Sequence, residues 1–180
     1  MNGHQKQQEQ SRQMIEDAFF SLLREKEYTR ITVSELTERA EVARRTFYRL
    51  YGRKEDIILH YFERLCANYY QEHSTLQCYD VEQIAKEFFT FWYSHRESLL
   101  LLQKNGLDYM IYSAISNASE KIVKHRIPDE NIVQDSDLQF FIDYSTGGFL
   151  QLFCRWLQQG MEGDPAEYAR AVGASIKKYL

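Results

Sequence analysis

The chain has little of what would direct it to a membrane, a disulfide scaffold or a β-rich fold. Only two of its 180 residues are proline, Pro128 and Pro165. No apolar run approaches the roughly 20 residues of a membrane-spanning helix, and the start shows no signal-peptide pattern. Its three cysteines, Cys66, Cys78 and Cys154, are odd in number and scattered, which argues against disulfides. We therefore expect a cytoplasmic protein.

Metal and catalytic signals are also sparse. Cys66 and His73 share a helix face, and Cys66 with Cys78 could form a redox pair. Both interpretations are weaker than that of cysteines as small apolar fillers, because no CxxC or HxxxH pair accompanies them. No nucleophile–base pair or phosphate-binding loop is found, so we expect no enzyme, no metal site and no cofactor.

What the sequence does contain is helical periodicity along most of its length. It predicts an all-α protein of about nine helices. The Gln-rich residues 1–10 lack this periodicity and are expected to be a disordered tail. Residues 11–56 are expected to form a three-helix unit with a helix-turn-helix, and residues 57–180 a second, bundle-like domain. A long helix over about 54–73 would join the two.

Residues 32–54 carry the strongest functional pattern. Thr32 and Glu35 have the spacing of a capping box that opens a short helix. A second short helix follows after a tight turn. Its inward stripe is predicted to be Ala43, Phe47, Leu50 and Tyr51, and its outward face Arg44, Arg45, Tyr48 and Arg49.

The charge of this segment predicts its partner. Between Arg39 and Lys54 there are six basic residues and one acid, a local net charge of +5. Guanidinium groups match both phosphate oxygens and the edge of guanine, so the second helix is predicted to read a DNA major groove. Residues 1–56 have a net charge of +1 and residues 57–180 of −5, so the acidic remainder would present only the basic end to DNA.

From about Arg12 to Phe62 the chain resembles the DNA-binding domain of TetR-family transcriptional regulators. The resemblance is carried by an ordered series: Ile15, Ala18, Phe19, Leu22, Ile31, Thr32, Val33, Leu36, Ala40, Val42, Thr46, Phe47, Tyr48, Tyr51, Gly52, Lys54, Glu55, Ile58 and Leu59. It implies that phosphates are held by Thr32, Thr46, Tyr48 and Lys54. It further implies that base edges are read by Arg44, Arg45 and Arg49.

Two positions of the turn depart from the family pattern. Glu41 stands where glycine is usual, so either a non-glycine residue adopts a left-handed backbone or the turn differs. Ala43 stands where serine is usual, which removes a helix cap and a phosphate donor.

The second domain is rich in aromatic residues, above all in the stretch from Phe88 to Tyr93. We interpret part of this set as the lining of a cavity for an apolar or aromatic effector, and an aromatic-rich core is the equally weighted alternative. The predicted ligand-binding residues are Phe88, Trp92, Tyr109, Tyr112 and Tyr144.

The last two helices carry small residues on their apolar faces, and Gly147 and Gly148 fall in mid-helix. The resemblance implies a homodimer through these two helices; the alternative is that the same faces complete the core of one subunit. The predicted dimer residues are Phe149, Trp156, Ala169, Gly173 and Ile176.

These features predict a sequence-specific DNA-binding transcriptional regulator. The favoured form is a ligand-responsive repressor that binds a near-palindromic operator as a homodimer. The alternative is an activator or co-regulator whose second domain binds a protein rather than a small molecule.

Overall fold

The structure is a computed structural model that describes residues 3–73, 80–126 and 137–179. Within these ranges the chain forms nine α-helices, one short 3₁₀-helix and no strand, which confirms the all-α prediction. The elements are α1 (Gly3–Glu25), η1 (Tyr28–Arg30), α2 (Val33–Arg39), α3 (Arg44–Leu50), α4 (Glu55–His73), α5 (Val81–Ser94), α6 (Arg96–Lys104), α7 (Asp108–Arg126), α9 (Leu138–Gln158) and α10 (Pro165–Tyr179).

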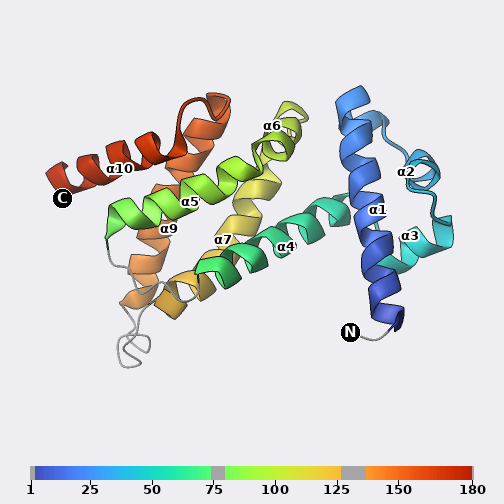
Figure 1. The fold of residues 1–180 in the computed structure, drawn as a ribbon, viewed down its shortest axis with the longest axis horizontal. Coiled ribbons are helices and arrows are strands. Elements are labelled where there is room, and N and C mark those ends of the chain that lie inside the picture. Colours follow the sequence, from blue (N-terminus) through green and yellow to red (C-terminus); the bar gives the residue numbers. More distant parts are fainter. Residues whose placement is uncertain (1–2, 74–79, 127–136, 180) are drawn as a thin grey trace.

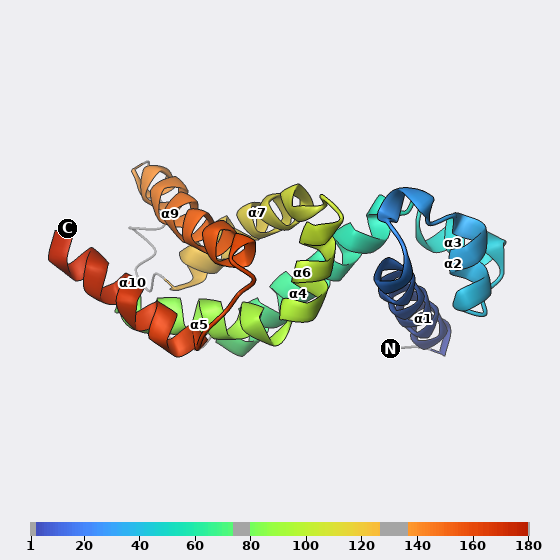
Figure 2. The same ribbon diagram turned by 90° about the horizontal axis from the view of Figure 1, so that it is seen from above.

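The helices form an elongated molecule with the helix-turn-helix at one end. Helices α1, α2 and α3 lie together there, and α5, α6, α7, α9 and α10 make up the other part (Figure 1). The long α4 leaves the first group and runs along the second. A perpendicular view shows the same order, with the C-terminus at the far end from α2 and α3 (Figure 2). Helix α4 is therefore the covalent link between the two parts, which also touch where α1 packs on α6.

A single buried apolar core runs through both parts of the molecule. In the first part, Phe20 on α1 packs edge-on against Tyr61 of α4, with ring centroids 4.9 Å apart. The next residue of α4, Phe62, packs against Trp92 of α5, with ring centroids 6.3 Å apart. The apolar face of α4 thus belongs to both halves of the core. A change in the tilt of α4 would therefore alter the packing in both parts of the molecule.

Helix α1 begins earlier than predicted. Residues 3–10, which we expected to be a disordered tail, continue the helix as exposed turns. The stretch contains Gln, Lys and Glu, which favour helix, and it extends a helix already nucleated by the apolar stripe that follows. It carries no apolar face of its own, which is why periodicity missed it. Met1 and Asn2 lie outside the described residues.

None of the helices in the described ranges has the length and apolar character needed to cross a bilayer.

Candidate nucleic-acid interface

The turn between α2 and α3 is built as the sequence indicates. Thr32 accepts a hydrogen bond from the Glu35 N–H at 3.2 Å, and the Glu35 carboxylate accepts one from the Thr32 N–H at 3.0 Å. This confirms the predicted capping box. Glu41 has φ = 53°, so this non-glycine residue does occupy the left-handed region. Ala43 stands at the N-cap of α3 with no side-chain cap, as its missing hydroxyl predicts.

Helix α3 has two sharply different faces. Phe47 is fully buried and Tyr51, just past the helix, is nearly so. On the outward face Arg44, Arg45 and Arg49 are exposed, and Tyr48 has 52% of its surface exposed. A buried phenylalanine on a helix of seven residues fixes the rotation of that helix, so the arginines are held outward by the core.

The outward arginines are free of the protein's own acids. In the described part of the chain, none of Arg44, Arg45 and Arg49 forms an ion pair. Arg44 instead lies near Tyr48, with its Nη2 3.4 Å from the phenol oxygen and its guanidinium carbon 5.9 Å from the ring centre. Three unneutralised guanidiniums on one short helix form a surface suited to phosphates and base edges.

The other basic residues counted in this segment are engaged within the protein. Arg39 donates to the Glu25 carboxylate at 2.6 Å and 2.9 Å. Arg53 pairs with Asp56 at 3.3 Å, an i,i+3 pair that the sequence could have shown. The partner of Arg39 lies 14 residues away on another helix, and no local pattern indicates it.

Lys54 also points into the protein. Its ammonium donates to the carbonyl oxygens of Ile31 at 2.6 Å and Tyr28 at 3.1 Å, and lies 4.3 Å from the centre of the Tyr28 ring. Burial lowers the pKa of this ammonium. We expected Lys54 to be placed for an external anion, but its charge satisfies the carbonyl groups at the end of η1, next to Thr32.

A buried carboxylate that the sequence analysis missed joins α1 to α4. Glu16 is almost fully buried, and it binds His60 Nδ1 at 2.9 Å and the Arg64 guanidinium. Beside it Arg12 lies over the Tyr51 ring, 5.2 Å from its centre. The only local signal for Glu16 is its position next to Ile15 on the buried side of α1. This cluster therefore connects α4 to α1 through buried polar contacts.

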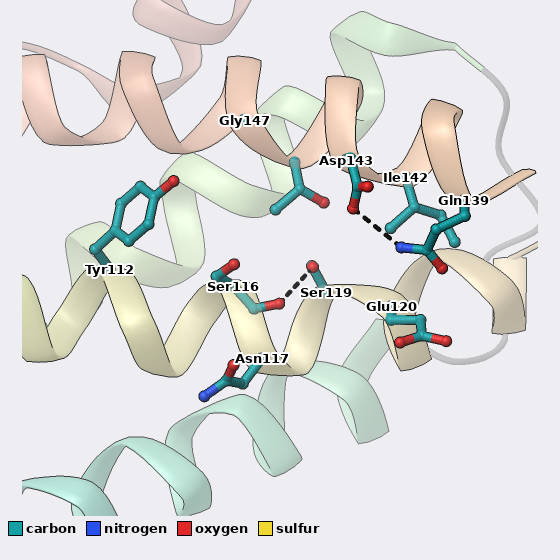
Figure 3. Close-up of a pocket in the computed structure, with 10 residues that line it drawn as sticks. Tyr112, Ser116, Asn117, Ser119, Glu120, Gln139, Ile142, Asp143 and Gly147 are labelled. Carbon is teal, nitrogen blue, oxygen red and sulfur yellow. Dashed lines mark hydrogen bonds between the residues drawn. The ribbon is translucent and has the colours of Figure 1, made fainter.

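The predicted ligand-binding residues are not brought together. Phe88 and Trp92 are buried in the core of the second part, where both pack against Phe153, at 5.8 Å in each case. Tyr109, Tyr112 and Tyr144 are exposed on α7 and α9. The buried pair therefore follows the aromatic-core alternative, and the expected apolar cavity lined by all five residues is not formed in the described ranges. Tyr112 lines a polar pocket between α7 and α9, and the other four are not among the residues described as lining it (Figure 3).

Three of the five predicted dimer residues are used within the subunit. Trp156 is buried, stacks on Tyr168 with ring centroids 5.3 Å apart, and donates from Nε1 to the Glu162 carbonyl at 3.0 Å. Ala169 is fully buried, and a Cβ added at Gly173 would lie 2.7 Å from the Cβ of Glu82. The small residues of α10 let it approach α5, so the prediction that Trp156, Ala169 and Gly173 face a second subunit is wrong.

Phe149 and Ile176 are the remaining two predicted dimer residues, and both are half-buried against the same core. A different face of α9 is open. Phe140, Phe141 and Tyr144 are 75%, 57% and 67% exposed. Further along the helix, the exposed Gly147 and Gly148 have no atom of the chain within 4 Å of where a Cβ would stand.

The two weaker interpretations, a metal site and a redox pair at Cys66, gain no support from the described residues. Cys66 is buried, and burial raises the pKa of its thiol to about 11. The side chain is therefore a protonated thiol at neutral pH and packs as a small apolar group. Cys78, its partner in the redox hypothesis, lies outside the described residues. In the ranges that the structure covers, no three His, Cys, Asp or Glu side chains are grouped to hold a metal ion.

Comparison with known proteins identifies the family of the chain. A family model described as "Bacterial regulatory proteins, tetR family" matches residues 15–61, and one described as "Transcriptional regulator C-terminal region" matches residues 79–178, more than half of the chain. An uncharacterized HTH-type transcriptional regulator, YxbF of Bacillus subtilis (strain 168), is 36% identical over 58 residues. That stretch is 32% of this chain and only 15% of the relative.

A solved structure, described as the dihydroxyacetone kinase operon activator DhaS, has the same fold. Its TM-score is 0.65 at 18% identity, over 93% of this chain and 95% of that one. The family models cover the helix-turn-helix with its exposed arginines as well as most of the second part. The chain therefore belongs to the TetR family of DNA-binding transcriptional regulators.

Proposed function

We propose that the chain is a repressor that binds a near-palindromic operator as a homodimer and responds to a small molecule bound in its second part. The observation that carries the proposal is the outward face of α3. Arg44, Arg45 and Arg49 stand there without an ion-pair partner in the described part of the chain, on a helix whose rotation the buried Phe47 fixes. A protein over two successive major grooves would cover a promoter that overlaps its operator.

The roles proposed for the DNA-contacting residues are, except at Lys54, those that the resemblance to the family implies. Arg44, Arg45 and Arg49 are assigned to base edges, and Thr32, Thr46 and Tyr48 to phosphates. Lys54 is assigned a supporting role, because its hydrogen bonds hold the end of η1 just before Thr32. The segment would thereby place the N-terminus of α2 at the phosphate backbone.

The test is DNA selection with the purified protein followed by gel-shift titration of variants. Arg45→Ala should weaken the selected site by about 1–3 kcal/mol and relax the preference at one base pair. Tyr48→Ala should weaken all sequences about equally. Arg170→Ala on α10 is the control, since it removes an exposed arginine far from α3. Unchanged affinity and base preference in Arg45→Ala would refute the assignment.

For the homodimer we propose the open face of α9 in place of the residues first predicted. Exposed aromatic side chains next to mid-helix glycines with open space above them suit the close approach of a second helix. A twofold axis near Gly147 and Gly148 would bury Phe140, Phe141 and Tyr144 on both subunits. The two α3 helices would then have to reach half-sites about 34–36 Å apart.

Sedimentation velocity tests the dimer. Tyr144→Asp should shift the protein toward the monomer, because it would bury a charge in the proposed contact. Tyr179→Asp introduces the same change at another exposed tyrosine, on α10, and should leave the dimer intact. A wild-type protein that remains monomeric at micromolar concentration would contradict the proposal.

A second candidate is an activator or co-regulator whose second part binds another protein. The exposed aromatic face of α9 favours it, since such a face suits a different protein as well as a second copy. The name of the structurally similar DhaS describes that protein as an operon activator. A reporter assay in the cytoplasm of a bacterial host decides the sign: repression falls when the gene is deleted, whereas activation requires it.

A further inference from the structure

A polar pocket lies between α7 and α9, in the second part of the molecule. It has a volume of about 390 Å³ and is open to solvent on one side. The two helices run antiparallel, with Tyr112 beside Gly147 and Glu120 near Gln139 (Figure 3). The lining residues are Tyr112, Ser116, Asn117, Ser119, Glu120, Gln139, Ile142, Asp143, Thr146 and Gly147.

The residues that line the pocket are more polar than those between the two helices elsewhere. Near one end α7 and α9 carry buried apolar residues, among them Ile111 and Leu150. Toward the other end most of the residues that line the pocket are polar and lie at helical spacing, with the buried Ile142 among them: Ser116, Ser119 and Glu120 on α7, and Gln139, Asp143 and Thr146 on α9. Polar side chains contribute little to the packing of two helices, so the stability of the fold does not account for them.

One group in the pocket wall lacks a hydrogen bond. The Thr146 hydroxyl oxygen is inaccessible to solvent and has no partner among the described residues. Its neighbour Ser145 donates to the Phe141 carbonyl at 2.7 Å, as helical hydroxyls often do. Leaving a buried hydroxyl unbonded is unfavourable, and a polar ligand with a small shift of the side chain would relieve it.

The charged side chains near the pocket indicate which chemical class of ligand it could bind. Asp143 accepts a hydrogen bond from Gln139 at 3.0 Å, and Glu120 pairs with Lys124 at 2.6 Å. Among the side chains that the structure describes, no Lys, Arg or His lines the pocket. An anionic ligand would face the carboxylates of Asp143 and Glu120, and the ammonium of Lys124 beside them is already paired with Glu120. An apolar ligand would displace water from the lining polar groups without replacing its hydrogen bonds. A ligand with several O–H or N–H donors and no negative charge satisfies the acceptors.

We propose that this pocket is the effector site and that it binds a small donor-rich molecule, a polyol or a polyamine, rather than the apolar effector suggested by the aromatic content. This inference rests on the proposed ligand-responsive function. A ligand that bridges α7 and α9 would change their separation, and α7 packs directly on α4, where Cys66 Sγ lies 3.9 Å from the Ala114 carbonyl. Helix α4 then carries the change to the DNA-binding helices.

Isothermal titration calorimetry on the full chain tests the site, with putrescine and sorbitol as the two probes. Citrate and 1-naphthol represent the anionic and apolar classes and should not bind. Asp143→Asn should weaken putrescine binding by about 10-fold and sorbitol binding by less than about 3-fold, since only the former loses an ion pair. Thr146→Val, which keeps the side-chain shape, should weaken whichever probe binds. Asp17→Asn on α1 is the charge-matched control.

Hydrogen exchange gives a readout that does not depend on variants. The bound probe should slow exchange in residues 116–120 and 139–147 relative to the rest of α7 and α9. The inference is overturned if neither probe binds saturably, if citrate or 1-naphthol binds in their place, or if Asp143→Asn and Thr146→Val leave probe binding unchanged. Gel shifts without any probe test DNA binding separately. If the protein binds no DNA in them, the proposed function is refuted, while the proposal that the pocket binds a ligand is not affected.

Discussion

Replacing Glu16 by alanine removes the carboxylate that joins α1 to α4. The side chain is 3% exposed and binds two cationic or potentially cationic partners, His60 at 2.9 Å and the Arg64 guanidinium. Both partners belong to α4, the helix that connects the DNA-binding unit to the second part. The variant therefore tests whether this polar cluster stabilises the crossing of the two helices.

The expected loss follows from the burial of the three groups. Removing one member of a buried ion pair costs about 3–5 kcal/mol when the remaining charge stays buried. Here the Arg64 and His60 side chains are 32% and 25% exposed, so water can solvate them after the change. We therefore expect a loss of about 2–3 kcal/mol. For a chain of this length that corresponds to a fall in Tm of about 4–12 °C.

The assay is thermal unfolding followed by circular dichroism at neutral pH, with a urea titration for the free energy of unfolding. Asp17→Ala is the matched control, because Asp17 precedes Ala18 on the same helix, carries the same charge and is exposed. It should shift the Tm by less than about 2 °C. Equal shifts for Glu16→Ala and Asp17→Ala would refute the reasoning, since they would show that the buried cluster adds no stability.

Three further predictions concern local features of the fold. Glu41→Gly should stabilise the protein by about 0.5–1 kcal/mol, because glycine adopts the left-handed backbone without strain; a lower Tm on thermal unfolding would contradict this. Gly173→Ala should lower the Tm, since its Cβ would lie 2.7 Å from a side-chain atom of α5, whereas Gly148→Ala meets nothing within 4 Å and should leave the fold of a subunit intact. Equal melting curves for the two variants would be incompatible with the packing described. The hydrogen bond from Lys26 is the main reason that the pKa of Glu35 falls to about 2. Its stabilising effect should be complete above pH of about 4.5 and be lost as the pH falls toward 2, so an acid titration should show a smaller loss of stability over that window in Glu35→Gln than in the wild type.

Local patterns were sufficient for most of the helix-turn-helix. The capping box at Thr32 and the buried Phe47 opposite exposed arginines depend on residues within a few positions of one another, whereas the sequence left open whether Glu41 is left-handed. Periodicity likewise predicted the order of the helices, because burial repeats with the helical turn. It missed residues 3–10, whose helix is polar on all sides.

The failures share a cause, which is that the partner lies far away in the sequence. Lys54 is a basic residue of the kind expected to contact a phosphate, yet its ammonium donates hydrogen bonds to two carbonyl groups that precede α2. Gly173 has the small surface expected of a dimer helix, yet α5 fills the space above it. A small or charged residue indicates that another group packs closely against it. The surrounding sequence does not show whether that group belongs to the same chain or to a partner.

The sequence by itself determined the all-α architecture, the helix-turn-helix and the face of α3 that carries the arginines, because each follows from the period of a helix and the chemistry of its caps. The tertiary structure alone decided which charges remain free and which small faces stay open. It placed Arg39 and Lys54 against internal partners, closed α10 onto α5, and left a polar pocket between α7 and α9. These outcomes depend on which helices pack side by side, and helical periodicity describes each helix alone.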